Sequence, residues 1–243
     1  ACGWFTDKVE MEAKPRGQDY VIRGTKLFVP YAHAAQWMIV SVQVEGKVSL
    51  FLLKSPAAGI QCTQLETLAS DKQAEVVFED VLLKRDNLIG KLGQGNTMLQ
   101  KIQLIAAVAK CAEMVGGAQR VLEMTIQYAK EREQFGHPIG AFQAIQHYCA
   151  DMVTDVDSSR LMTYEAAWQI SEGLPFAKEA AMAKAWVGEA YQRVTNLGVQ
   201  IHGGIGFSVE HNMQLYYRRA KEAEVFAGDP DAFREKVAQE LVL

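Results

Sequence analysis

An arginine followed by an aromatic residue and a glycine gives this chain its clearest candidate for chemistry. Arg132 stands three residues before Phe135, and Gly136, Pro138 and Gln143 follow. A guanidinium group can hold two phosphate oxygens at once through parallel N–H donors. The pattern also has a structural interpretation, in which a basic residue favours the last turn of a helix, Gly136 caps that helix and Pro138 prevents its continuation.

A second candidate is the glycine-rich segment Gln200–Gly206, which reads QIHGGIG. Glycine allows a positive φ and lets a backbone approach a ligand closely. A glycine cluster at the end of a helix, taken alone, indicates no more than a turn. Its weight comes from its spacing to Arg132 and to the helical segment through Arg218 and Lys221.

Together these segments resemble the acyl-CoA dehydrogenases, flavoenzymes that desaturate acyl thioesters. The resemblance is carried by the stretch 200–229, QIHGGIGFSVEHNMQLYYRRAKEAEVFAGD, and by the RxxFG spacing with a following FQ. It covers essentially the whole chain and implies FAD as cofactor and acyl-CoA as substrate. It gives His202 no catalytic role. The residues for which it implies FAD contact across a subunit interface are Arg132, Phe135, Gln143, Gln200, Gly203 and Gly204.

The family's catalytic base has no counterpart in this sequence. Most members carry a glutamate where this chain has Ala227, and some carry it on a long helix at the position of Ala106. An alkyl side chain cannot accept the α-proton of an acyl thioester. The family's Asp-x-x-Arg, which helps to hold the thioester, corresponds to Leu104 and Ala107. The resemblance therefore implies flavin binding without the usual proton acceptor.

Two neighbouring carboxylates are candidates for a replacement base. Glu224 lies one helical turn, roughly 5 Å, before position 227, and Asp229 lies two residues after it. Each also has an ordinary structural interpretation: Glu224 on a solvated helix face, and Asp229 as an N-cap before Pro230. A carboxylate from another domain or another subunit is a further alternative.

On the flavin-ring side of the site the resemblance is weaker. Family members often carry Trp-x-Thr in the sheet domain, and the matching positions here are Phe28 and Pro30. Phe28 can still stack on a ring, whereas Pro30 supplies neither a hydroxyl nor an N–H. We therefore expect Phe28 to contact the cofactor and Pro30 to leave the flavin N5 without its usual donor.

The elements that must position these residues change character near Gly90. Before it, apolar runs between turn residues predict strands, with a hairpin connection at 45–47. After Gly95 the apolar spacing becomes helical, with a stop at Gly173 and a start at Pro175. The predicted strands are 20–22, 26–29, 38–42, 49–53 and 74–78. The predicted helices are 98–133, 141–172, 175–200, 211–226 and a short helix opened by Asp229 and Pro230.

This arrangement predicts an α+β chain with two domains. Residues 1–92 form an antiparallel β-sandwich or barrel, and residues 93–243 form an antiparallel four-helix bundle. The resemblance identifies these as the family's middle domain, truncated at its start, and its C-terminal domain. The family's N-terminal helical domain is absent from this chain, which also lacks an initiating Met and so is expected to be a fragment.

Composition excludes several classes of function. The 25 basic and 29 acidic side chains form no basic stripe, so we expect neither nucleic acid nor a membrane surface as a partner. The longest apolar runs, such as 104–109, are far shorter than the roughly 20 residues that cross a bilayer. The four cysteines have no metal-ligand spacing, which predicts free thiols in a reducing cytoplasm and no metal site.

Three functions remain. The leading one is an acyl-CoA dehydrogenase-like flavoprotein of lipid metabolism that carries out α,β-desaturation as a homotetramer or heterotetramer, or as a dimer, assembled through its helical bundle. The second is a non-catalytic partner subunit that completes the FAD site of a glutamate-bearing homologue. The third is another flavin oxidase or oxygenase chemistry on the same fold.

Overall fold

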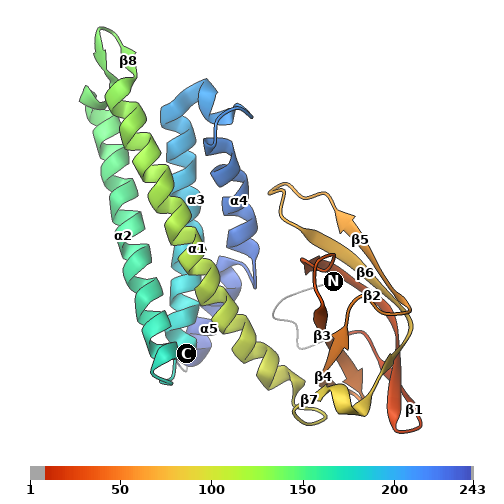
Figure 1. Ribbon diagram of the computed structural model, residues 1–243. Coiled ribbons are helices and arrows are strands. Elements are labelled where there is room, and N and C mark those ends of the chain that lie inside the picture. Colours follow the sequence, from red (N-terminus) through yellow and green to blue (C-terminus); the bar gives the residue numbers. More distant parts are fainter. Residues whose placement is uncertain (1–8, 242–243) are drawn as a thin grey trace. The chain divides into compact units, whose positions relative to one another are not determined.

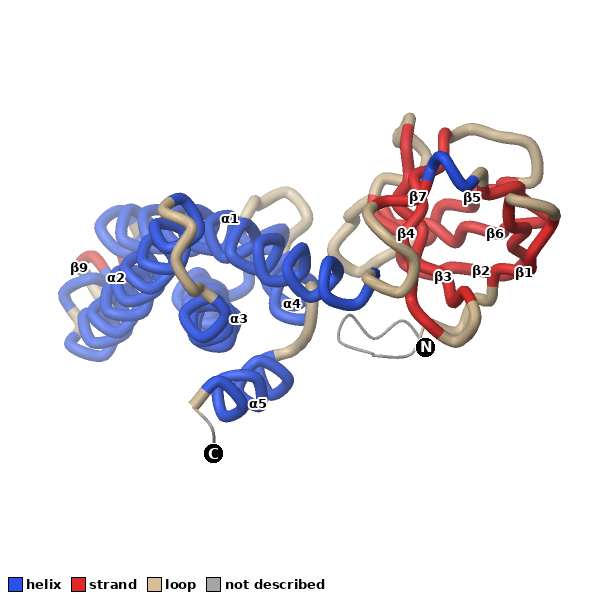
Figure 2. The backbone as a smooth tube through the Cα atoms, turned by 90° about the horizontal axis from the view of Figure 1, so that it is seen from below, coloured by secondary structure: helices blue, strands red, loops and turns tan. Residues whose placement is uncertain are grey.

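The computed structural model describes residues 9–241 and divides into two compact units, residues 1–102 and 103–243 (Figure 1). Figure 2 shows the strands β1–β7 gathered in the first unit and the long helices in the second. Helix α1 (Gly95–Glu131) begins in the first unit and continues into the second.

The first unit is a sandwich of two antiparallel sheets. One sheet has the order β1-β2-β6-β5 and the other β3-β4-β7. Buried residues alternate with more exposed ones along β3 and most of β6, which places one face of each strand in the interior. Both sheets contribute to one core, with Ile22 and Val76 from the first and Val42 and Phe51 from the second. The strands are β1 (Ala13–Arg16), β2 (Asp19–Pro30), β3 (Trp37–Val44), β4 (Lys47–Lys54), β5 (Ile60–Leu65), β6 (Gln73–Leu83) and β7 (Leu88–Ile89).

The predicted antiparallel sandwich is confirmed, with differences in single strands. The segments 20–22 and 26–29, predicted as two strands, belong to the single strand β2, whose register against β6 shifts between Ile22 and Gly24 and again between Lys26 and Val29. The hairpin connection at 45–47 is confirmed, because Glu45 and Gly46 both have a positive φ between β3 and β4.

The second unit is helical, and the predicted bundle is confirmed. Helix α3 is its centre, packing against α2, α4 and α5. It also packs closely on α1, because a Cβ at Gly117 of α1 would lie 2.5 Å from the Tyr191 hydroxyl, and one at Gly198 of α3 would lie 2.7 Å from Val121. The helices are α1, α2 (Gln143–Ser171), α3 (Ala177–His202), α4 (Met213–Val225) and α5 (Pro230–Glu240).

Three helix ends test the sequence analysis. Gly173 ends α2 as predicted: its φ is +67°, and its N–H and that of Leu174 donate to carbonyls of the last turn. Pro175 was expected to open α3, but the helix begins two residues later, at Ala177. Gly136 was expected to cap the preceding helix, and this is wrong, because α1 ends at Glu131 and Gly136 lies in the turn of a short hairpin.

Candidate functional site

The glycine turn follows directly from the end of α3. Gly203 has a φ of +61°, which breaks the helix, and a 3-10 segment spans Gly203–Phe207. Gly203 and Gly204 are exposed, and a Cβ added to either would meet nothing within 4 Å. Gly206 differs, because its Cβ would lie 3.0 Å from the Val199 carbonyl oxygen. Packing therefore requires Gly206, whereas the surface over Gly203 and Gly204 is open to another molecule.

Arg132 lies at the base of the hairpin between α1 and α2. Strands β8 (Glu133–Gln134) and β9 (His137–Pro138) pair through a turn in which Phe135 and Gly136 have φ values of +55° and +83°. Two successive positive φ values define the tight turn that a two-residue hairpin favours. This turn leaves the Phe135 side chain 90% exposed at the tip. Arg132 is also exposed. Within residues 9–241 its side chain makes no hydrogen bond or ion pair.

The candidate FAD-contact residues of the helical unit come together at one end of the bundle. Gln143 opens α2 and Gln200 lies in the last turn of α3, and both side chains are exposed. The end of α1, the start of α2 and the end of α3 lie at the same end of the unit, where β8 is labelled in Figure 1. The predicted grouping of Arg132, Gln143 and the glycine turn on one surface is therefore compatible with the fold.

Next to the glycine turn lies a group of rings that connects α1, the end of α3 and the segment before α4. The Tyr128 ring of α1 stacks on His202 of α3 at 4.4 Å between centroids, and His211 lies 5.0 Å from His202. The Nδ1 of His202 lies 2.7 Å from the Gly198 carbonyl oxygen, so that nitrogen carries the proton. Burial lowers the pKa of His202, and the nearby His211 acts in the same direction. His202 is thus a neutral, buried support for the turn.

Position 227 lies in the turn between α4 and α5. Ala227 has no exposed surface and a φ of +60°. Lys184 of α3 donates from Nζ to the carbonyl oxygens of Glu224 and Gly228, at 2.6 and 3.1 Å. The position that the resemblance aligns with the family's base is thus an apolar side chain, in a turn whose carbonyls Lys184 binds.

The two candidate substitute carboxylates are both engaged elsewhere. Glu224 does not lie on a solvated face as expected: its side chain is only 14% exposed, and Oε2 accepts from Lys221 at 2.6 Å and Gln192 at 3.1 Å. Asp229 is the predicted N-cap, accepting the Ala232 N–H at 2.8 Å. Each carboxylate thus makes structural hydrogen bonds through one oxygen, Oε2 of Glu224 and Oδ1 of Asp229, so both are weak candidates for a base.

The alternative base position and the thioester positions lie on the first part of α1. Ala106 is half-buried, and Leu104 and Ala107 are buried. Their side chains contribute to packing and offer no polar atom. The structure therefore agrees with the sequence that these positions supply neither a base nor a charged contact.

Phe28, the candidate flavin-ring contact, lies in the first unit. It has a φ of +57° and is 54% exposed, at the second irregularity of β2. Such bulges turn a side chain out of the sheet, and they are frequent beside active sites. Pro30 ends the same strand and pairs with Gln73 of β6. The backbone thus presents Phe28 outward, where an aromatic surface is available for contact.

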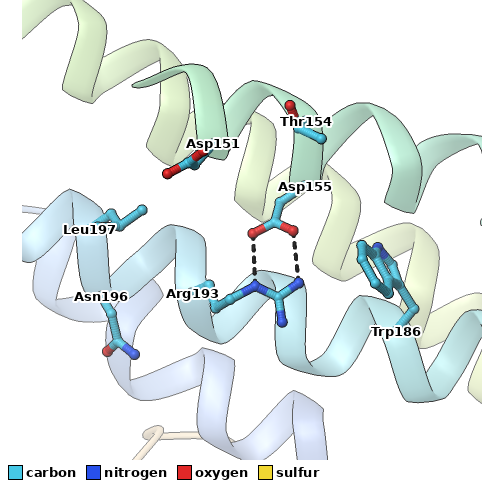
Figure 3. Close-up of a pocket in the computed structure, with 7 residues that line it drawn as sticks. All are labelled: Asp151, Thr154, Asp155, Trp186, Arg193, Asn196 and Leu197. Carbon is cyan, nitrogen blue, oxygen red and sulfur yellow. Dashed lines mark hydrogen bonds and ion pairs between the residues drawn. The ribbon is translucent and has the colours of Figure 1, made fainter. Parts of the chain in front are cut away.

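A groove between α2 and α3 lies outside the predicted site. Asp155 of α2 accepts two hydrogen bonds from Arg193 of α3, at 2.9 Å to Nε and 2.7 Å to Nη2, and Trp186 lies 5.2 Å from the guanidinium (Figure 3). Because Asp155 already neutralises Arg193, the groove offers no free guanidinium for a phosphate. It is lined by Asp151, Thr154, Asp155, Trp186, Arg193, Asn196 and Leu197.

Lys184, which binds the backbone on both sides of position 227, was not among the residues predicted from the sequence. A signal was available, because Lys184 falls on the stripe of small and apolar residues that α3 buries, four residues after Ala180 and three before Val187. A lysine on a buried stripe has to find polar partners inside the protein.

The predicted absence of a metal site stays a prediction, although residues 9–241 contain no group of three or more His, Cys, Asp or Glu side chains suited to a metal ion. None of the helices described is both long and apolar enough to span a membrane.

Comparisons with known proteins cover both units. The family model "Acyl-CoA dehydrogenase, C-terminal domain" matches residues 93–242, and "Acyl-CoA dehydrogenase, middle domain" matches residues 4–81. Similar proteins include the acryloyl-CoA reductase (NADH) of Anaerotignum propionicum, 32% identical over 92% of this chain and 59% of that protein. The probable acyl-CoA dehydrogenase YngJ of Bacillus subtilis is 34% identical over 96% of this chain and 64% of its own length.

Solved structures show the same arrangement. The butyryl-CoA dehydrogenase of Megasphaera elsdenii is 28% identical, with a TM-score of 0.92 over 96% of this chain and 63% of that one. The structure described as PigA with FAD and proline is 27% identical, with a TM-score of 0.94 over 99% and 65%. The chain thus spans about three fifths of the length of the curated relatives it matches. Because the two family models together cover nearly all of its residues, this chain belongs to the acyl-CoA dehydrogenase family of oxidoreductases.

Proposed function

We propose that this chain is part of an FAD-dependent enzyme that desaturates an acyl-CoA thioester, and that it contributes the phosphate-binding surface for FAD. The observation that carries the proposal is the open end of the bundle, where exposed Arg132 and the uncovered glycines Gly203 and Gly204 lie on neighbouring elements. A guanidinium suits a diphosphate, and glycines without a Cβ let such a group approach the backbone closely. Relatives named as acyl-CoA enzymes, and a neighbour described with FAD bound, support this assignment.

In this reaction the α-carbon loses a proton to a base, the β-carbon loses a hydride, and a double bond forms between them. Bound FAD would supply the hydride acceptor. Arg132, Gln143, Gln200, Gly203 and Gly204 would hold its diphosphate end, with Phe135 and Phe28 adding aromatic contacts. None of these residues can take the proton, and Ala227 and Ala106 cannot take it either. The base therefore comes from another part of the protein or from another subunit.

An oligomer fits both the open FAD surface and the outer face of α2. Leu161, Tyr164 and Trp168 are spaced by three and four residues on that helix, and each is more than half exposed. Such a stripe suits burial against another subunit. We propose a dimer or tetramer assembled through the helical unit.

The described cysteines, Cys62, Cys111 and Cys149, are unpaired thiols, which supports a reducing compartment such as the cytoplasm.

Arg132→Ala tests the cofactor surface. Loss of a charged donor to phosphate is expected to weaken FAD binding by about 10- to 100-fold, measured as flavin absorbance retained by the assembled protein after dialysis. Arg120→Ala is the matched control, because Arg120 is an exposed arginine on α1 that pairs with Glu123. Unchanged flavin content in Arg132→Ala would overturn the assignment.

The apolar residues at positions 227 and 106 favour a second candidate, a non-catalytic partner subunit. In that case the purified chain is colourless alone and acquires FAD only when mixed with a glutamate-bearing homologue. A yellow protein that an acyl-CoA bleaches in the absence of oxygen supports the enzyme instead. Flavin that is bound but not reduced by any acyl-CoA would point to the third candidate, another flavin chemistry on this fold.

A further inference from the structure

The interior of the helical unit contains one buried ammonium group. Among residues 9–241, the only buried acidic or basic side chains are Lys184 and His202. Lys184 has no exposed surface. Moving an ammonium group out of water costs several kcal/mol unless polar partners surround it. The identity of those partners shows what the side chain does.

The Lys184 ammonium joins three consecutive segments of the chain. Its Nζ donates to the carbonyl oxygen of Glu224 in the last turn of α4 and to that of Gly228 in the following turn. It also lies 5.3 Å from the centre of the Phe233 ring in α5. The last carbonyls of a helix lack intrahelical donors, and a cation there is stabilised by the helix dipole. One side chain therefore holds the end of α4, the turn and the start of α5.

The charges around Lys184 agree with this role. Burial lowers the pKa of Lys184 to about 8, while the carboxylates of Glu224, Glu222 and Asp229 act in the opposite direction. The neighbouring Cys111 of α1 supplies no counter-charge at neutral pH, because burial raises the pKa of its thiol to about 12. At pH 7 Lys184 is thus an ammonium whose nearest partners are the two backbone carbonyls.

The turn that Lys184 holds has a strained backbone. Ala227 adopts a φ of +60°, in the left-handed region that L-residues other than glycine rarely occupy. Such a conformation persists only where the surrounding structure imposes it. The two carbonyls that Lys184 binds lie on either side of position 227, so they fix the backbone from which that side chain projects.

We propose that Lys184 is a positioning residue that sets the conformation of the turn between α4 and α5, and with it the direction of the side chain at position 227. The conformational part stands on the contacts of Lys184. Its meaning for catalysis, that position 227 faces the reacting atoms, rests on the proposed function.

Hydrogen exchange of the intact protein tests the proposal without any reading of activity. Lys184→Met keeps the length of the side chain and removes all three donors. Exchange at residues 226–229, corrected for intrinsic rates, is expected to become about tenfold faster, while amides in α1 and α2 change much less. Lys178→Met is the matched control on the same helix, where the lysine is partly exposed and pairs with Glu179, and it should leave the turn unchanged.

Two outcomes would overturn the proposal: unchanged exchange at 226–229, or an equal acceleration throughout the helical unit, which would mean a general loss of stability. Lys184→Gln, which keeps two N–H donors without the charge, should give an intermediate rate and serves if the methionine variant does not fold. If the turn loosens while Arg132→Ala leaves flavin binding intact, the positioning role stands and the proposed function fails.

Discussion

The glycine-turn surface and the α4–α5 turn, which lie at the two ends of helix α4, satisfy their polar groups in opposite ways. At the glycine-turn surface, Arg132 is exposed and its side chain has no hydrogen-bond or ion-pair partner within residues 9–241. Gly203 and Gly204 face open space. At the second, Ala227 is fully buried, and Lys184 binds the carbonyls on either side of it. The first surface is built to contact another molecule, whereas the second is completed by contacts within the chain.

The two regions differ in what the proposed site requires of them, which is cofactor binding at one and a catalytic base at the other. A surface that binds cofactor phosphates needs exposed donors, and Arg132 is one on the FAD surface that we propose. A catalytic base needs a carboxylate within reach of the substrate proton, and here one oxygen of Glu224 accepts from Lys221 and Gln192 while one oxygen of Asp229 caps α5. At position 227 the chain has an alanine, in a turn whose backbone Lys184 binds on both sides.

The largest effect that would sharpen this comparison is a pH dependence specific to the α4–α5 turn. The pKa of Lys184 is lowered from 10.5 to about 8 in the folded protein, so between these values the unfolded chain binds more protons. The free energy of unfolding therefore rises with pH across that window, by at most about 3 kcal/mol, and the cost of the buried charge is fully present below pH 8. Urea unfolding at pH 7 and pH 10 should show this rise in the wild type relative to Lys184→Met. Parallel curves would mean that Lys184 is not a buried ammonium.

A smaller effect separates two glycines of the same turn. Gly206→Ala places a Cβ 3.0 Å from the Val199 carbonyl oxygen and 3.2 Å from the Cβ of His202, so we expect a loss of about 2 kcal/mol in stability. Gly204→Ala meets nothing within 4 Å, and its stability should stay within about 0.5 kcal/mol of the wild type. Chemical denaturation measures both. If Gly204→Ala were the more destabilising variant, the open surface would be wrongly described.

The smallest expected effect concerns Asp229. Asp229→Ala removes the N-cap of α5 and should cost about 1 kcal/mol in unfolding free energy, while Asp229→Asn keeps an acceptor for the Ala232 N–H and should cost little. Reduction of the flavin by an acyl-CoA in Asp229→Asn provides the contrast. A stable variant whose flavin is no longer reduced would show that Asp229 acts as a base. The α4–α5 turn would then take part in catalysis, and the two regions would not differ as described.

Much of this fold was predictable because it depends on local patterns. The long helices follow from apolar spacing, and the stop at Gly173 and the cap at Asp229 follow from the chemistry of single residues. The strands β1 and β5 were missed because they are the edges of their sheet, and most of their residues are exposed and polar. The break predicted within β2 is an irregularity at Gly24, which apolar periodicity cannot distinguish from a loop.

The sequence by itself determined the family and the two-part architecture, because both follow from residue types at fixed spacing. It also predicts that the usual base is replaced, by Ala227. Only the tertiary structure decided that Arg132 is exposed, that Glu224 is largely buried and bonded to its neighbours, and that Gly136 turns a hairpin instead of capping a helix. It alone revealed Lys184, whose partners lie 40 and 44 residues away. Spacing along a chain reports which side chains are present, whereas their hydrogen bonds depend on contacts between distant segments that form only when the chain is folded.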